Sequence, residues 1–238
     1  RASTIGAKNS NFINPHGLPD NDHYTTSYDL ALITRDALKN KIFAKIVGTK
    51  KYTISRLSNE SWDRVLQNKN KMLWQYPGGD GVKTGYTKKA GRCLVSSATK
   101  ENWQILCVVL NCSDTWGSSA KLLNYGFENY DNIKVIDKQN TIINLNIKKG
   151  KEKYIQVIPK NDLYVPLLKI NDEYEKIDYI QNLPKIIKAP IKKNEKAGVL
   201  KVYAGNFLLG QVDLMYNKDV ESSDIFYHLK NILKSFLR

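Results

Sequence analysis

Cysteines, histidines and long apolar runs are scarce in this sequence, and each scarcity excludes a class of protein. The chain has three cysteines and three histidines, which are too few and too irregularly spaced for a disulfide framework or a metal site. No apolar run is long enough to cross a membrane as a helix. A phosphate-binding loop is also missing, because Gly78-Gly79-Asp80-Gly81 lacks the spacing and the following helix. We therefore expect no metal and no cofactor.

The charge of the chain is strongly one-sided. Its net charge is +14 and its pI about 9.5, so the surface should attract nucleic acid, anionic lipid or anionic wall polymer. The lysines are spread singly, and without an arginine-rich cluster or zinc-finger spacing we do not expect nucleic acid as a partner. The chain opens on Arg1-Ala2-Ser3-Thr4, without an initiating Met or the pattern of a signal peptide. We interpret this start as a cut into a larger polypeptide.

The first half of the chain mixes helical and strand-like patterns. After a loop over residues 1–24, Thr26 or Ser27 should cap a helix that carries Asp29 in its first turn. Further along we expect a short helix at 41–47, a strand at 52–57, a polar loop at 66–74, and strands at 91–98 and 103–110. The last two strands, joined by a turn at 99–102, predict an antiparallel meander with the stretch that precedes them.

A helix should then open at Asp114–Ser118, with four apolar residues inward: Ala120, Leu122, Leu123 and Phe127. From about Asp131 the pattern becomes short and alternating, as in Ile143–Ile147. Further strands are predicted at 154–158, 163–167, 187–191, 200–203 and 208–214, the last two flanking a hairpin turn at Ala204-Gly205-Asn206. Strands about ten residues apart favour a small β-sandwich.

The last twenty residues follow helical spacing, with apolar side chains at Ile225, Leu229, Ile232, Leu233, Phe236 and Leu237. Two interpretations of this amphipathic helix stay open. It packs on the β-sandwich, or it lies on a membrane surface with Lys230, Lys234 and Arg238 reaching the headgroups.

One stretch organises the chain, Gly79-Asp80-Gly81-Val82-Lys83-Thr84-Gly85-Tyr86-Thr87. We expect two glycine-rich turns around a short strand. Glycines let a ligand approach the backbone, and a lysine beside a threonine can hold a carboxylate by charge and by hydrogen bond. A bare Lys-Thr-Gly also fits a hairpin with a solvated lysine, because so short a motif occurs by chance.

The order of several motifs makes the stretch more specific. Asn14-Pro15-His16-Gly17-Leu18 is followed by His23-Tyr24-Thr25-Thr26, then by Asp80–Thr87 with Ala90-Gly91, a β-domain and a terminal helix. Over essentially its whole length the chain resembles the low-molecular-mass penicillin-binding proteins, the serine D-alanyl-D-alanine carboxypeptidases.

The resemblance implies an α+β fold. Residues 1–131 would be the C-terminal part of a transpeptidase-like domain, an antiparallel sheet with helices on both faces. Residues 132–216 would be a small all-β sandwich, and 217–238 a membrane-anchor helix. The partners implied are peptidoglycan stem peptides, β-lactam antibiotics, the missing N-terminal part of the same domain, and an anionic membrane surface through residues 219–238. The implied location is the extracytoplasmic face of the bacterial membrane, as a peripheral protein.

The resemblance also implies a mechanism. In the family, a serine in a Ser-x-x-Lys motif attacks the bond between two D-alanines, and water later hydrolyses the acyl-enzyme. By that likeness Lys83 supplies positive potential and Thr84 binds the substrate's terminal carboxylate. Gly85 and Thr87 complete the substrate-binding strand, and the backbone amide of Tyr86 forms half of the oxyanion hole.

The chain departs from the family in one respect. Ser-x-x-Lys and Ser-x-Asn should both precede Lys83, and none of the first 82 residues fits either motif. Ser97-Ala98-Thr99-Lys100 and Ser118-Ser119-Ala120-Lys121 match the first pattern but follow Lys83, and we interpret them as turn and cap residues. We expect Ser113-Asp114-Thr115 to be a helix cap as well. The nucleophile is thus predicted to be absent from this chain, which alone should be inactive.

Three functions compete at this stage. The first is a serine D,D-carboxypeptidase that trims wall peptides, and the second is a non-catalytic, membrane-associated wall scaffold derived from such an enzyme. A β-lactamase shares Lys-Thr-Gly, but the β-domain and tail after Asp131 argue against it.

Overall fold

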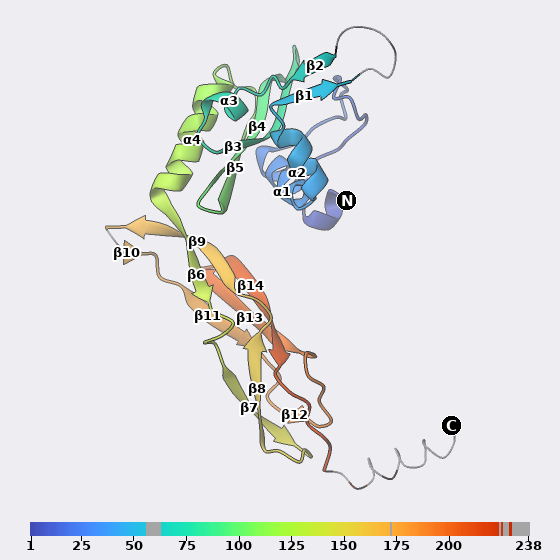
Figure 1. Ribbon diagram of the computed structural model, residues 1–238, viewed down its shortest axis with the longest axis vertical. Helices are drawn as coiled ribbons and strands as arrows, with labels where there is room; N and C mark the ends of the chain where they lie inside the picture. Colours follow the sequence, from blue (N-terminus) through green and yellow to red (C-terminus); the bar gives the residue numbers. More distant parts are fainter. Residues whose placement is uncertain (56–62, 172, 224, 226–228, 230–238) are drawn as a thin grey trace. The chain divides into compact units, whose positions relative to one another are not determined.

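The computed structural model describes residues 1–55, 63–171 and 173–223 together with Ile225 and Leu229. It divides into two compact units, Arg1–Asn129 and Tyr130–Arg238 (Figure 1). The division falls two residues before the boundary expected from the sequence.

The first unit is built on a three-stranded antiparallel sheet. Its strands, in the order β3-β4-β5, are β3 (Gly79–Thr87), β4 (Gly91–Lys100) and β5 (Trp103–Val109). This confirms the predicted meander. Lys83 lies opposite Val95 and Thr84 opposite Leu94, so β3 is paired on one side only within the described residues. A strand edge near the Lys-Thr-Gly motif is therefore open.

Helices cover both faces of this sheet (Figure 1). On one face, α4 (Thr115–Asn129) and the short α3 (Met72–Gln75) bury a core of Met72, Tyr76, Leu94, Ala98 and Leu123. On the other face lie α1 (Ser27–Leu38) and α2 (Lys41–Gly48), which contact strands β3, β4 and β5. A one-turn 3-10 helix, η1 (Ser3–Ile5), and a two-stranded ribbon of β1 (Lys51–Ile54) and β2 (Arg64–Gln67) complete the unit.

Local sequence signals explain where the helices begin. The Thr26 side chain accepts a hydrogen bond from the amide of Asp29, as the predicted cap of α1 requires. Asn40 caps α2 in the same way. Asp114 caps α4, because its Oδ1 accepts from the amide of Gly117 at 2.9 Å. The cap interpretation of Ser113-Asp114-Thr115 is confirmed.

Three local predictions in the first unit were wrong. Residues 66–74 are only partly a loop, since β2 ends at Gln67 and α3 begins at Met72; α3 spans only four residues and is too short to leave a periodic pattern. No turn separates Gly79 from Lys83, because β3 runs unbroken from Gly79 to Thr87. Leu122 does not point inward, because it is 47% exposed while Leu123 beside it is fully buried.

The second unit consists of two sheets. One has the order β10-β9-β6, formed by β6 (Tyr130–Ile136), β9 (Leu163–Ile170) and β10 (Glu173–Tyr174). The other has the order β11-β13-β14-β8-β7-β12. Its strands are β7 (Ile143–Lys148), β8 (Tyr154–Pro159), β11 (Asp178–Asn182), β12 (Ile187–Lys188), β13 (Lys196–Ala204) and β14 (Phe207–Tyr216).

A single core joins the two sheets, with Ile136 of β6 packed among Ile155, Val202 and Leu214 of the larger sheet. The predicted all-β unit with its hairpin turn around Gly205 is confirmed, but β6, β10 and β11 were not anticipated. The predicted terminal helix, 217–238, is wrong over residues 217–223, because Val220 and Ser222 form β-bridges with Ile191 and Gly150. Most of its remaining residues lie outside the described part of the chain. Within the part of the chain that is described, no helix has the length and apolarity needed to span a bilayer.

Candidate substrate-binding edge

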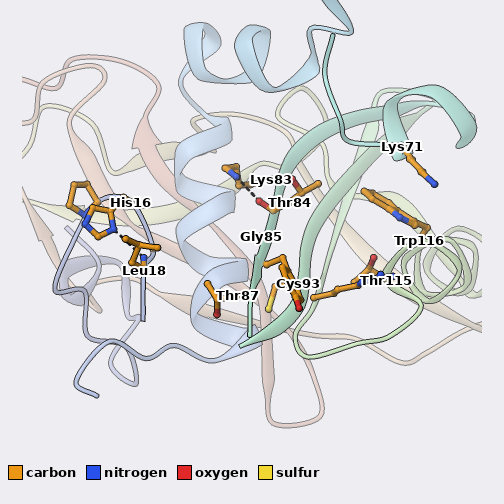
Figure 2. A pocket seen from close by; sticks show the side chains of 14 residues that line it. His16, Leu18, Lys71, Lys83, Thr84, Gly85, Thr87, Cys93, Thr115 and Trp116 are labelled. Carbon is orange, nitrogen blue, oxygen red and sulfur yellow. Dashed lines mark hydrogen bonds between the residues drawn. The ribbon is translucent and has the colours of Figure 1, made fainter. Parts of the chain in front are cut away.

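The predicted site residues lie together along one edge of the first unit. Lys83, Thr84, Gly85, Tyr86 and Thr87 all line a cavity of about 1000 Å³ at the open edge of β3. Figure 2 shows Lys83 and Thr84 between a loop that carries His16 and Leu18 on one side and Trp116 and Lys71 on the other. The cavity thus combines a strand edge with residues that are distant in the sequence.

The strand sets the orientation of each group. Thr84 and Tyr86 are two residues apart, so their backbone N–H groups point to the same side of β3. Lys83 is exposed, and its Nζ donates to the carbonyl oxygen of Thr84 at 2.5 Å. Thr87 also has a structural task, since its Oγ1 accepts from the amide of Ala90 in the β3–β4 turn at 3.0 Å.

Gly85 leaves space at this edge. A Cβ added there would meet only the Cβ of Cys93, at an ordinary contact distance of 4.0 Å. Packing in the described structure therefore does not require a glycine. Its absent side chain keeps the backbone accessible to a ligand.

The carboxylate of Asp80 anchors the start of β3. It accepts hydrogen bonds from Ser97 Oγ (2.5 Å), Thr99 Oγ1 (2.5 Å) and Gln104 Nε2 (2.8 Å). These donors come from β4 and β5, so a single carboxylate ties all three strands together three residues before Lys83.

The loop at Asn14–Leu18 forms one wall of the cavity. The Asn14 side chain accepts from the amide of Gly17 at 2.7 Å and donates to the carbonyl of Leu18 at 3.0 Å. His16 Nδ1 accepts from the amide of Leu18 at 3.1 Å, and His23 Nδ1 accepts from the amide of Ile13. Both histidines therefore satisfy backbone groups of the loop, and His16 also lines the cavity.

Several cavity residues were not predicted from the sequence. Trp116 and Cys93 are both only partly buried, and both line the cavity. Lys71 and Arg92 line it too, and Arg92 is tied by Nη1 to the carbonyl of Ser113 at 3.4 Å. A useful signal was available for Arg92: it lies opposite Tyr86 in the β3–β4 pairing that the meander already implied.

The electrostatic character of the cavity follows from its lining. Three cationic side chains, Lys71, Lys83 and Arg92, line it, and none of the described lining residues is a carboxylate. Thr115 and Trp116 add the N-terminal turn of α4, where backbone N–H groups favour negative charge. The cavity is suited to an anionic ligand.

Neither Ser-x-x-Lys match lies in this cavity. Ser97 is fully buried on β4 and donates to Asp80, and Lys100, three residues on along a strand, points to the opposite face. Ser118 lies in the first turn of α4, where its Oγ is 3.3 Å from Cys112 Sγ. Among the described residues, no cluster of His, Cys, Asp and Glu could hold a metal ion.

Comparison with known proteins agrees with this architecture. The family model for D-alanyl-D-alanine carboxypeptidases matches residues 1–114, and the family model for the C-terminal domain of penicillin-binding protein 5 matches residues 130–222. The chain belongs to the D-alanyl-D-alanine carboxypeptidase family. The two matches fall within the two structural units.

Two relatives and one solved structure illustrate the family likeness. The chain is 30% identical over 240 residues to D-alanyl-D-alanine carboxypeptidase DacF of Bacillus subtilis, covering 98% of this chain and 60% of that protein. It is 28% identical to DacA of Haemophilus influenzae, covering 93% and 56%. The crystal structure of penicillin binding protein 5 from Haemophilus influenzae has a TM-score of 0.70 at 26% identity, covering 93% of this chain and 64% of that one. The chain therefore spans about 60% of the length of these carboxypeptidases, and the α+β fold with a C-terminal β-domain is that of penicillin-binding proteins.

Proposed function

We propose that this chain supplies the substrate-binding edge of a serine-type D-Ala-D-Ala carboxypeptidase, which removes the terminal D-alanine of peptidoglycan stem peptides through an acyl-enzyme. The observation that carries the proposal is the cationic cavity at the open edge of β3, formed around Lys83, Thr84 and Tyr86. A peptide that ends in a free carboxylate matches it in charge and can extend the sheet by pairing with an edge strand.

Each residue has a distinct role in this proposal. Thr84 Oγ1 donates to the terminal carboxylate of the substrate, while Lys83 and the neighbouring cations provide positive potential. The backbone N–H of Tyr86 stabilises the oxyanion of the tetrahedral intermediate. Gly85 lets the substrate backbone approach, and Thr87 holds the turn that ends the strand.

We infer that the nucleophilic serine comes from a segment other than this one. The buried, strand-bound geometry of Ser97 and the position of Ser118 outside the cavity lining support this inference. Such a segment, with Ser-x-x-Lys and Ser-x-Asn motifs, would meet β3 across the cavity. A protein completed in this way would also be acylated by β-lactams, which resemble the D-Ala-D-Ala peptide.

The proposed location is the outer face of the bacterial cell membrane. Stem peptides of peptidoglycan lie there, and the amphipathic pattern of residues 219–238 fits a peripheral attachment.

Labelling with a fluorescent penicillin tests whether the nucleophilic serine lies outside this chain. We expect no covalent label on the 238-residue chain, and a label on the protein completed by a Ser-x-x-Lys segment. A label mapped by mass spectrometry to Ser97, Ser118 or any other serine of this chain would overturn the proposed absence of the nucleophile. If the completed protein is not labelled either, the non-catalytic wall scaffold is the better description.

A further inference from the structure

Lysines gather at one end of the second unit. Four lie in the turn between β7 and β8 or at its edges, and four lie on the neighbouring segments after β11 and β14. We call this group the basic end; it comprises Lys148, Lys149, Lys151, Lys153, Lys188, Lys192, Lys193 and Lys218. All eight are exposed.

Backbone contacts hold these segments side by side. β12 pairs in parallel with β7, which places Lys188 beside Lys148. The amide of Lys193 donates to Asp219 at 2.6 Å, and the amide of Lys151 donates to the carbonyl of Glu221 at 3.0 Å. Figure 1 shows the β7–β8 turn and β12 at the same end of the unit. The basic end is therefore one continuous surface.

The net charge of the unit is concentrated there. Four acidic residues accompany the eight lysines of the basic end, namely Glu152, Glu195, Asp219 and Glu221. The other described residues of Tyr130–Ser223 contain eight lysines and seven acidic residues. The excess of positive charge thus lies almost entirely at this end.

Internal ion pairs account for only part of the basic end. Lys151 pairs with Glu221 and Lys218 with Glu152. No described carboxylate forms an ion pair with Lys148, Lys153, Lys188, Lys192 or Lys193. Their ammonium groups remain available to an external anion.

The basic end also contacts the segment that follows β14, where the chain leaves the sheets of the second unit. Val220 is buried and bridges to Ile191, and the amide of Ser223 donates to the carbonyl of Lys149 at 2.8 Å. The sequence then enters the apolar series that begins with Ile225 and Leu229, which are 69% and 51% exposed. A cationic surface directly followed by exposed apolar side chains fits a lipid bilayer, which offers anionic headgroups and an apolar interior.

We propose that the basic end binds anionic phospholipid headgroups and forms a membrane contact separate from the apolar residues of the C-terminal segment. The proposal rests on the proposed peripheral location, but it is independent of catalysis. Each lysine near an anionic surface strengthens binding by roughly a factor of five. Because several lysines act together, the basic end makes vesicle affinity sensitive to salt.

The test compares two variants of the full chain with equal charge loss. In the first, Lys148, Lys153, Lys188 and Lys192 are changed to Gln; in the control, Lys138, Lys160, Lys176 and Lys201 are changed to Gln. Sedimentation measures binding to phosphatidylcholine vesicles with and without about a third of phosphatidylglycerol, and the melting curve of each variant checks its fold. We expect the first variant to lose at least about tenfold in affinity for the anionic vesicles and the control less than about twofold.

Three results would overturn the proposal: equal losses in both variants, no loss in either, or equal binding of the unmodified chain to neutral and anionic vesicles. Binding to a soluble anionic wall polymer without vesicle binding would assign the surface to a different partner and would also overturn it. Because penicillin labelling is measured separately, failure here leaves the proposed enzymatic role standing.

Discussion

Replacing the carboxylate of Asp80 tests how β3 is held against β4 and β5. Replacing it with alanine removes the acceptor of three hydrogen bonds that join β3 to β4 and β5. The hydroxyl of Ser97 is fully buried, so leaving it unpaired should cost roughly 1–3 kcal/mol. Thr99 and Gln104 reach water more readily and lose about 0.5–1 kcal/mol each. The expected destabilisation of the first unit is therefore about 2–5 kcal/mol.

Tryptophan fluorescence provides a selective assay. All four tryptophans, Trp62, Trp74, Trp103 and Trp116, precede Tyr130, so a urea titration followed by fluorescence reports on the first unit of the full chain. The double variant Asp80→Ala with Ser97→Ala should lose no more unfolding free energy than Asp80→Ala alone, because it also removes the hydroxyl that Asp80→Ala leaves without an acceptor. Two results would refute the reasoning. One is a double variant whose loss of unfolding free energy equals the sum of the losses of the two single variants. The other is a loss below about 0.5 kcal/mol for Asp80→Ala.

Two further predictions concern the core and the acid limit of stability. Leu123→Ala should destabilise the first unit by about 2–5 kcal/mol, whereas Leu122→Ala on the same helix should stay within about 0.5 kcal/mol, because Leu123 is fully buried and Leu122 is 47% exposed; similar midpoints in urea would contradict the packing described for α4. Hydrogen bonds from Tyr174 and Lys169 hold the pKa of Asp131 below its ordinary value. Since the pKa is lower in the folded state, the carboxylate stabilises the second unit above about pH 4, and this contribution is lost as the pH falls through the folded pKa. Tyr174→Phe should raise the pKa of Asp131 in a carboxyl NMR titration, and an unchanged pKa would count against the bond.

The sequence indicated those parts of the fold that have strong local signals. Thr26 caps α1 as its position before an apolar repeat required, and the apolar strands on both sides of Glu101-Asn102 formed the expected hairpin. β6 was missed because Tyr130–Ile136 follows α4 without a turn signal between them. Leu122 and Leu123 are neighbours of equal hydrophobicity, and only the tertiary packing of α4 decides which of them is buried.

The site residues also divide into those with a local sequence signal and those that only the tertiary fold brings together. Lys83, Thr84 and Tyr86 could be named from the motif because they lie within four residues of each other on a single strand. His16, Lys71, Arg92 and Trp116 come from separate segments, and no local pattern brings them to the cavity. Glycine spacing suggested turns where β3 is continuous, because a glycine that allows close packing looks in a sequence like a glycine that forms a turn. A Cβ on Gly79 would lie 2.2 Å from the carbonyl oxygen of Met72.

Substrate discrimination by the completed enzyme tests the role of the β3 edge most directly. We expect Thr84→Val to lower kcat/KM for a peptide ending in a free D-Ala-D-Ala carboxylate by about tenfold or more, since a hydrogen bond to a charged group is lost. Turnover of the matching peptide with a C-terminal amide should change by less than about threefold. Thr53→Val on the exposed strand β1, outside the cavity, is the control. An equal loss for both peptides in the Thr84→Val variant would contradict the carboxylate-binding role of this edge.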